Sequence, residues 1–221
     1  MGELKAEVSS LADTAEIGTA AWWDRVVREF QVFDSPVVVG SKTTYAVLDP
    51  TKQIVKRVAV KQDASGTVVI KVAKEVGGSL EPLDDATGND EIGSLESYLI
   101  SRQPFGVDFL LVNLAADKLR VYATVYYHPV LDIDSVKEAV DQAIKGYIAA
   151  LSFDGKVYVR RLTDAIQLAA GVRDVSPVVI SGSSGSLSVS TDQVYETASG
   201  HVVEDPDVLF LSTLQFEPFE P

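Results

Sequence analysis

The sequence contains no cysteine and only two histidines, and it has fewer basic than acidic residues. The absence of cysteine excludes disulfide bonds, a thiolate nucleophile and any cysteine-ligated zinc or iron–sulfur centre. His128 and His201 leave little scope for histidine chemistry. Lysine and arginine total 19 against 32 aspartates and glutamates, a formal net charge of -13. Because this charge repels phosphates and anionic headgroups, we expect neither sequence-specific nucleic-acid binding nor membrane binding.

Long apolar runs are also missing. No run approaches the roughly 20 residues that span a bilayer, and the acidic N-terminus lacks the basic start and apolar centre of a signal peptide. Of the 221 residues, 46% are hydrophobic, which is enough for one or two cores. We therefore expect a soluble globular protein, and the composition by itself assigns no activity.

Residues 1–104 predict N-terminal helices followed by an antiparallel β-meander. Apolar residues at helical spacing predict one helix before Gly18 and a second over 19–31, capped by Thr19. β-branched residues between turn-like segments then predict strands near 43–48, 53–62 and 67–74. A surface loop leads into a further helix over about 91–102.

Two apolar strand runs open the next segment, residues 105–180. They cover 107–113 and 118–128, and only residues 114–117 separate them. A hairpin is the simplest interpretation of two such runs.

An amphipathic helix follows, with apolar residues spaced by three and four positions. Ser135 and Glu138 predict a capping box at its start. A second helix is predicted over about 160–170, closed by Gly171, with a return strand over 172–180.

The remaining residues, 181–221, predict a β-rich C-terminal tail, so the whole chain is assigned to the α+β class. The serine and glycine run at 181–186 has neither the P-loop lysine nor a nucleophile elbow and is expected to form a turn or hairpin tip. A last strand is predicted within 208–216. From Asp174 onward there are eight acidic residues and no lysine or arginine, so we expect this lobe to meet a basic neighbour. The candidate contacts are Glu204, Asp205, Asp207, Glu217 and Glu220.

Trp22 and Trp23 form the one concentrated aromatic feature. Adjacent residues on a helix point about 100 degrees apart, so one ring can enter the core while the other contacts a partner. Core packing of both rings is the alternative. We expect at least one of them to be buried against another subunit.

Asp132 and Asp134 are spaced as in carboxylate pairs that hold a divalent cation under a nucleotide-sugar phosphate. They also lie just ahead of a predicted helix, where carboxylates favour the positive end of the helix dipole. No glycine-rich loop accompanies them, and no motif fixes a Ser-His-Asp triad. We therefore assign no catalytic residue, metal or cofactor.

The block from Tyr127 to Val179 resembles the C-terminal module of baseplate J-like proteins of phage tails. The resemblance is carried by residues 143–155 (AIKGYIAALSFDG), 157–167 (VYVRRLTDAIQ) and 170–175 (AGVRDV). Residues 19–24 and 199–203 are similar to tail or baseplate-type proteins of phages and prophages infecting Bacteroidetes, including crAss-like phages.

This resemblance implies a structural virion protein, assembled in the host bacterial cytoplasm and held in a homo-oligomeric ring. Its expected partners are portal, tail-tube or baseplate subunits, and it carries over no catalytic residue. Two alternatives stay open. One is a cation-dependent nucleotidyl- or glycosyltransferase using Asp132 and Asp134, and the other is a non-viral binding module.

Overall fold

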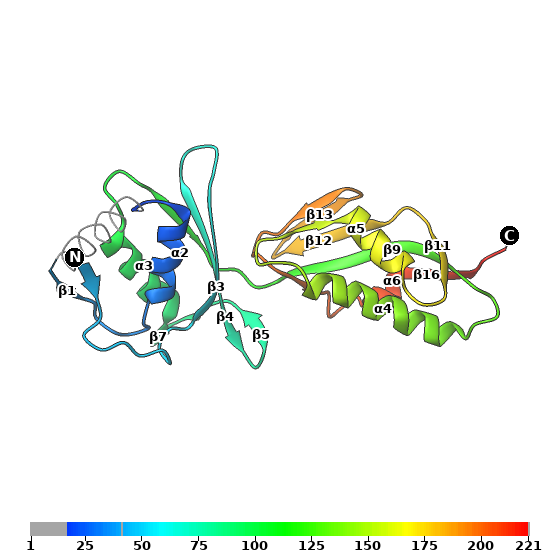
Figure 1. Ribbon diagram of the computed structural model, residues 1–221, viewed down its shortest axis with the longest axis horizontal. Helices are drawn as coiled ribbons and strands as arrows, with labels where there is room; N and C mark the ends of the chain where they lie inside the picture. Colours follow the sequence, from blue (N-terminus) through cyan, green and yellow to red (C-terminus); the bar gives the residue numbers. More distant parts are fainter. Residues whose placement is uncertain (1–16, 41, 221) are drawn as a thin grey trace, which may run out of the picture. The chain divides into compact units, whose positions relative to one another are not determined.

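The computed structural model describes residues 17–40 and 42–220. The helix predicted before Gly18 lies outside these residues. Helices and mainly antiparallel strands are interspersed along the chain, which confirms the α+β class (Figure 1). The chain divides into two compact units, the first ending at Asn113 and the second starting at Leu114.

The first unit contains two helices whose starts are fixed by side-chain caps. Helix α2 (Ala20–Glu29) begins after Thr19, whose hydroxyl accepts a 3.2 Å hydrogen bond from the backbone N–H of Trp22. Helix α3 (Glu91–Arg102) begins after Asp90, whose carboxylate accepts from Gly93 N–H at 2.7 Å. The strands of this unit are β1 (Val37–Val39), β2 (Lys42–Thr44), β3 (Val55–Gln62), β4 (Val68–Val76), β5 (Ser79–Glu81), β6 (Asp85–Ala86), β7 (Asn89–Asp90) and β8 (Phe109–Val112).

The predicted meander over 43–74 is wrong in its first strand. Strand β2 pairs with β1, whereas β3, β4 and β5 form the antiparallel series and β8 joins β4 in parallel. The reason is Tyr45, a buried ring whose hydroxyl accepts from the backbone N–H of Gln31 at 3.1 Å. This contact draws the chain out of β2 and toward the end of α2, so the strand stops at Thr44.

The predicted hairpin between 107–113 and 118–128 is also wrong, because its two strands belong to different sheets. Strand β8 pairs with β4 in the first unit, and β9 (Asp117–Tyr127) lies at the centre of the second. At the end of β8, the side chain of Asn113 accepts from Leu83 N–H and donates to Leu83 C=O, at 2.8 and 2.9 Å. The chain is therefore tied to the first unit up to this residue.

The sheet of the second unit is built around β9 (Figure 1). Strands β11 (Val172–Val175) and β12 (Val179–Ser184) run antiparallel along one side of it, and β13 (Leu187–Thr191) pairs with β12. Strands β15 (Val202–Glu204) and β16 (Leu214–Pro218) run parallel along the other side. The other elements are β10 (Lys156–Tyr158), β14 (Val194–Glu196), α4 (Ile133–Ala149), α5 (Val159–Gln167) and α6 (Phe210–Thr213).

Several local expectations for this unit need correction. The cap of α4 is Asp132, not Ser135, which instead donates to it, and the predicted capping box with Glu138 does not form. Gly171, with φ of 89°, lies in the turn before β11, beyond the end of α5 at Gln167. The predicted return strand is split into β11 and β12. Between them the N–H of Thr124 donates to the side-chain hydroxyl of Ser176, at 2.7 Å, instead of to a backbone carbonyl of a paired strand. The run at 208–216 holds α6 as well as β16.

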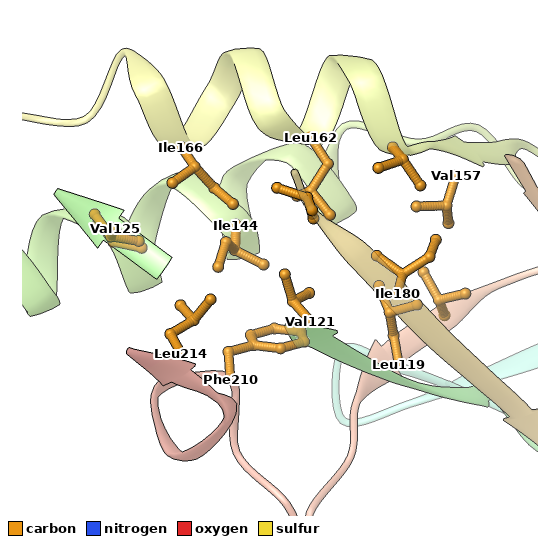
Figure 2. Packing of buried hydrophobic residues seen from close by; sticks show 14 of the residues in the cluster. Leu119, Val121, Val125, Ile144, Val157, Leu162, Ile166, Ile180, Phe210 and Leu214 are labelled. Carbon is orange, nitrogen blue, oxygen red and sulfur yellow. The ribbon is translucent and has the colours of Figure 1, made fainter. Parts of the chain in front are cut away.

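The core of this unit lies between one face of the sheet and the helices α4 and α5 (Figure 2). Alternate residues of β9 point into it, as expected for a strand covered on one face. The central buried residues are Leu119, Val121, Val125, Ile144, Leu162, Ile166, Ile180 and Phe210. The buried hydrophobic residues of the helices α4, α5 and α6 all belong to this core. The opposite face of β9 carries Lys118, Arg120, Tyr122, Thr124 and Tyr126.

Gly182 in β12 is required by the ring of Tyr195, which packs directly on its backbone. A Cβ at this position would lie 2.2 Å from the ring. We expect Gly182→Ala to destabilise the protein by about 1–3 kcal/mol, because the ring cannot move without disturbing the core.

Gly146→Ala is the matched control. Gly146 is exposed within α4 and has no neighbour within 4 Å of an added Cβ. We expect this substitution to stabilise the protein by about 0.5–1 kcal/mol. Urea unfolding of both variants measures the two effects, and equal effects of the same sign would contradict the packing argument.

Candidate assembly surfaces

Asp132 and Asp134 hold the start of α4. The carboxylate of Asp132 accepts from the backbone N–H and the hydroxyl of Ser135, both at 2.9 Å, and these bonds keep the pKa of Asp132 below its usual range. Asp134 lies 3.5 Å from Lys137 Nζ, one turn along. Within residues 17–40 and 42–220, no group of three or more possible ligands could hold a metal ion, and no helix is long and apolar enough to cross a membrane.

Both tryptophans are buried inside the first unit. Trp23 is fully buried and Trp22 is 8% exposed. Their rings meet edge to face at 4.9 Å, and the Trp23 ring lies 5.6 Å from that of Phe109 in β8. Both rings therefore pack in the core of this unit, because α2 turns them toward the same cluster. An interface at Trp22 or Trp23 would require this core to open.

Asp205 is an internal ion-pair partner, contrary to the expectation that it forms an exposed contact. It is 1% exposed, and its carboxylate lies 2.7 Å from Arg120 Nε and accepts from the backbone N–H of Asp207. Arg120 and the other partners hold the pKa of Asp205 below its usual range. Asp205 thus joins the segment after β15 to the outward face of β9.

Glu204 is also engaged within the chain. One carboxylate oxygen accepts from Phe210 N–H at 2.7 Å, at the start of α6, and the other lies 3.3 Å from Lys145 on α4. Several acids of the tail therefore take part in the fold. They pair with bases that lie earlier in the sequence, which a count of charges within the tail cannot show.

The other three acidic candidates remain accessible. The side chain of Asp207 is 79% exposed although it lies 3.2 Å from Lys118 Nζ, and Glu217 and Glu220 are exposed. A shallow hollow of about 630 Å³ lies beside Glu217 and Glu220. It is lined by Tyr126, Asp174, Glu217, Pro218, Phe219 and Glu220. No basic side chain lines this hollow, so it presents one sign of charge.

A second exposed surface, which sequence reasoning missed, lies in the first unit. Strand β1 exposes all three of its valines, with Val38 at 74% and Val39 at 63%. Val47 and Leu48, a few residues beyond β2, are 75% and 66% exposed. We call these four residues, together with Val37, the valine ribbon. Among the described residues β1 pairs only with β2, and this two-stranded pairing, which the sequence does not show, leaves the valines of β1 exposed.

Asp117 anchors the segment before β15 and was likewise missed, because the sequence placed it in a hairpin turn. It is fully buried, and its carboxylate accepts from Tyr195 Oη–H at 2.8 Å, Ala198 N–H at 2.6 Å and Ser199 N–H at 3.1 Å. Burial, followed by the hydrogen bond to this carboxylate, raises the pKa of Tyr195. Asp117 therefore holds the Tyr195 ring over Gly182.

The second unit thus has a defined layout: a long central strand, two helices on one face, and a return segment locked by a buried carboxylate. Residues 119–199 match the family model of the Baseplate J-like protein C-terminal domain. The match runs from β9 to the segment that Asp117 holds, and it covers less than half of the chain. No curated protein matches the sequence. The family match supports a relation between residues 119–199 and the baseplate J-like proteins of phages.

The ion pair of Asp205 predicts a loss of stability in acid. Because its folded pKa is lowered, its contribution is present above the unfolded value of about 3.9 and is lost as the pH falls through the folded pKa. We expect Asp205→Asn to lower stability at about pH 7 and to approach the parent protein at about pH 3. Urea midpoints across this range measure the difference. Asp207→Asn, at an exposed position, is the control, and a gap for Asp205→Asn that stays constant with pH would contradict the assignment.

Asp117→Ala should be more damaging than any exposed acidic substitution. It leaves two buried donors, of Tyr195 and Ser199, and the partly buried N–H of Ala198 without this acceptor, and each buried unsatisfied group costs about 1–3 kcal/mol when no water enters. We expect the urea midpoint to fall markedly and the fluorescence of the Tyr195 region to change. Tyr195→Phe should lose only a part of this stability, and an equal loss from both variants would show that Asp117 acts through the tyrosine alone.

Proposed function

We propose that this protein is a structural subunit of a bacteriophage virion, in the tail, the baseplate or a connector ring, and that it acts through protein–protein assembly. The observation that carries the proposal is the family match over the strand, helices and return strands of the second unit. The side chains that could have suggested chemistry have structural partners. Asp132 caps α4, so it gives no support to the transferase alternative.

The exposed apolar side chains favour an assembly role over a free-standing domain. The valine ribbon exposes five large apolar side chains within residues 37–48, and exposed apolar surface of this kind on soluble proteins marks interaction sites. Such a surface is expected of a subunit that is covered by a neighbour in its final state. A homo-oligomeric ring would provide that neighbour, with the first unit contributing the contact.

The exposed acids of the second unit are suited to a basic neighbour such as a portal or tail-tube subunit. Glu217 and Glu220 line a hollow that has no basic lining residue, and Asp207 is accessible near the other end of β9, beside Lys118. Opposite charge steers two surfaces together and fixes their orientation. We propose these three residues as the docking contacts, in place of the five suggested by the sequence.

The finer biological setting follows from the sequence resemblance. Residues 19–24 and 199–203 support assignment to phages or prophages that infect Bacteroidetes, including crAss-like phages. Assembly would take place in the host bacterial cytoplasm. The test is mass spectrometry of purified particles from a host carrying the gene: we expect the protein in the particle at a fixed copy number, and its absence from intact particles would refute the virion role.

Replacing Asp207, Glu217 and Glu220 by their amides should slow docking on a basic neighbour and leave the subunit folded. Exposed charges are screened over about 8 Å at physiological salt, so docking of the parent protein should also slow as salt rises. Association rates with the neighbouring subunit at low and high salt measure both effects. Asp63→Asn in the first unit is the control, because Asp63 bonds within its own turn. Docking that is insensitive to both salt and the amides would leave these acids as a solubilising surface.

A further inference from the structure

Strand β13 is an edge strand that lacks the features that normally protect an edge. It pairs with β12 and with no other strand in the described residues, and its sequence, LSVST, has no charge and no proline. Its pairing shows no bulge. Leu187 is 73% exposed and Val189 is 55% exposed. Uncharged, flat edges with apolar side chains readily pair with another strand.

The other edge strands of the same sheet are protected, which makes β13 an exception. Strand β16 ends in Glu217 and Pro218, and proline cannot donate to a neighbouring strand. Strand β15 has three residues, including Glu204. Strand β11 carries Arg173 and Asp174, and its pairing is irregular. Each of these other edge strands thus carries a charged residue, a proline or an irregular pairing that disfavours the addition of another strand.

We infer that β13 pairs antiparallel with β13 of a second copy of the chain, centred on Val189. This inference rests on the proposed assembly role and names one of its contacts. The sequence of the strand is complementary to itself in this register. Val189 faces Val189 of the partner subunit, Leu187 faces Thr191 of the partner subunit, and Ser188 faces Ser190 of the partner subunit.

The register also keeps like faces together. In the pairing of β12 with β13, Val189 lies opposite Gly182 and Leu187 opposite Ser184, so both are on the face of the sheet that bears the helices. Ser188 and Ser190 lie on the other face. In this register an antiparallel partner continues the sheet with its apolar side chains on the same face as those of the first copy. A shift by one residue would place them on the opposite face.

Charge is consistent with a second copy despite the net charge of -13. The acid nearest to the strand in sequence is Asp192, three positions from the centre, and it would face Ser186 of the partner subunit. The two copies of Asp192 would then lie six residues apart, about 20 Å along the strand direction. This exceeds the Debye length of about 8 Å at physiological salt, so their repulsion is largely screened.

A two-fold pair of this kind cannot by itself close a ring of more than two copies. A ring would need a second, head-to-tail contact, for which the valine ribbon is available. The β13 pair is therefore a separate contact with its own symmetry and can be tested in solution without particles.

The absence of cysteine from the chain allows a direct test with single-cysteine variants of the full chain. Under mild oxidation at about 0.1 mM protein, we expect Val189→Cys to form a disulfide-linked dimer about tenfold faster than Leu168→Cys, because pairing holds two thiols at a millimolar effective concentration. Leu168 is 86% exposed on the surface and serves as the matched position. Leu187→Cys should not link to itself, whereas Leu187→Cys with Thr191→Cys should.

Sedimentation gives a second measurement that does not depend on oxidation. The parent protein and Leu168→Lys should dimerise with rising concentration, and Val189→Lys should remain a monomer with an unchanged urea midpoint. Equal cross-linking at positions 189 and 168, or dimerisation unaffected by Val189→Lys, would overturn the self-pairing. If these variants still enter particles at normal copy number, the assembly role stands and only the β13 contact is refuted.

Discussion

The second unit depends on β9, the one strand with which four others pair. Strands β11 and β12 follow one side of it, and β15 and β16 follow the other. Its alternation divides the sheet into a core face, with Leu119, Val121 and Val125, and a polar face that begins with Lys118 and Arg120. Every segment that returns to the sheet must match this alternation, because a shift by one residue would expose the core side chains.

Charge pairing reinforces this arrangement at both ends of the return path. Asp117 at the start of β9 accepts three hydrogen bonds from the segment 195–199, and Arg120 on the opposite face binds Asp205 after β15. Buried carboxylates are tolerated when several donors satisfy them, as they are here. A chain with a large acidic excess thus uses a part of that excess to close its own sheet, and leaves another part on the surface.

Local signals allowed the helices α2 to α5 to be predicted closely, whereas α6 and the pairing between distant strands could not be predicted. The helix over 91–102 lies where the sequence placed it, because Asp90 caps it and Pro104 follows its end. The hairpin failed because two adjacent apolar runs give no sign that they belong to different sheets. Likewise, the first N–H of α6, that of Phe210, donates to the carboxylate of Glu204 outside the helix, so a window over 208–216 indicates only an apolar strand. Among the candidate acidic contacts, Glu204 and Asp205 are engaged by Lys145 and Arg120. These partners lie far away in sequence, so the sequence could not show which acids stay exposed.

The parallel pairing of β16 with β9 has a consequence for how the second unit forms. Thr213 donates to the carbonyl of Val121 from 92 positions along the chain, and Leu214 pairs with Ala123. When contacting residues are so far apart in sequence, the entropy cost of closing the loop between them comes before the contact stabilises the fold. This order slows folding. During synthesis β9 emerges long before β16, so one side of the central strand stays unpaired until the end of the sheet has been made. The order of translation therefore leaves β9 with an open edge for most of the time in which the unit is being built.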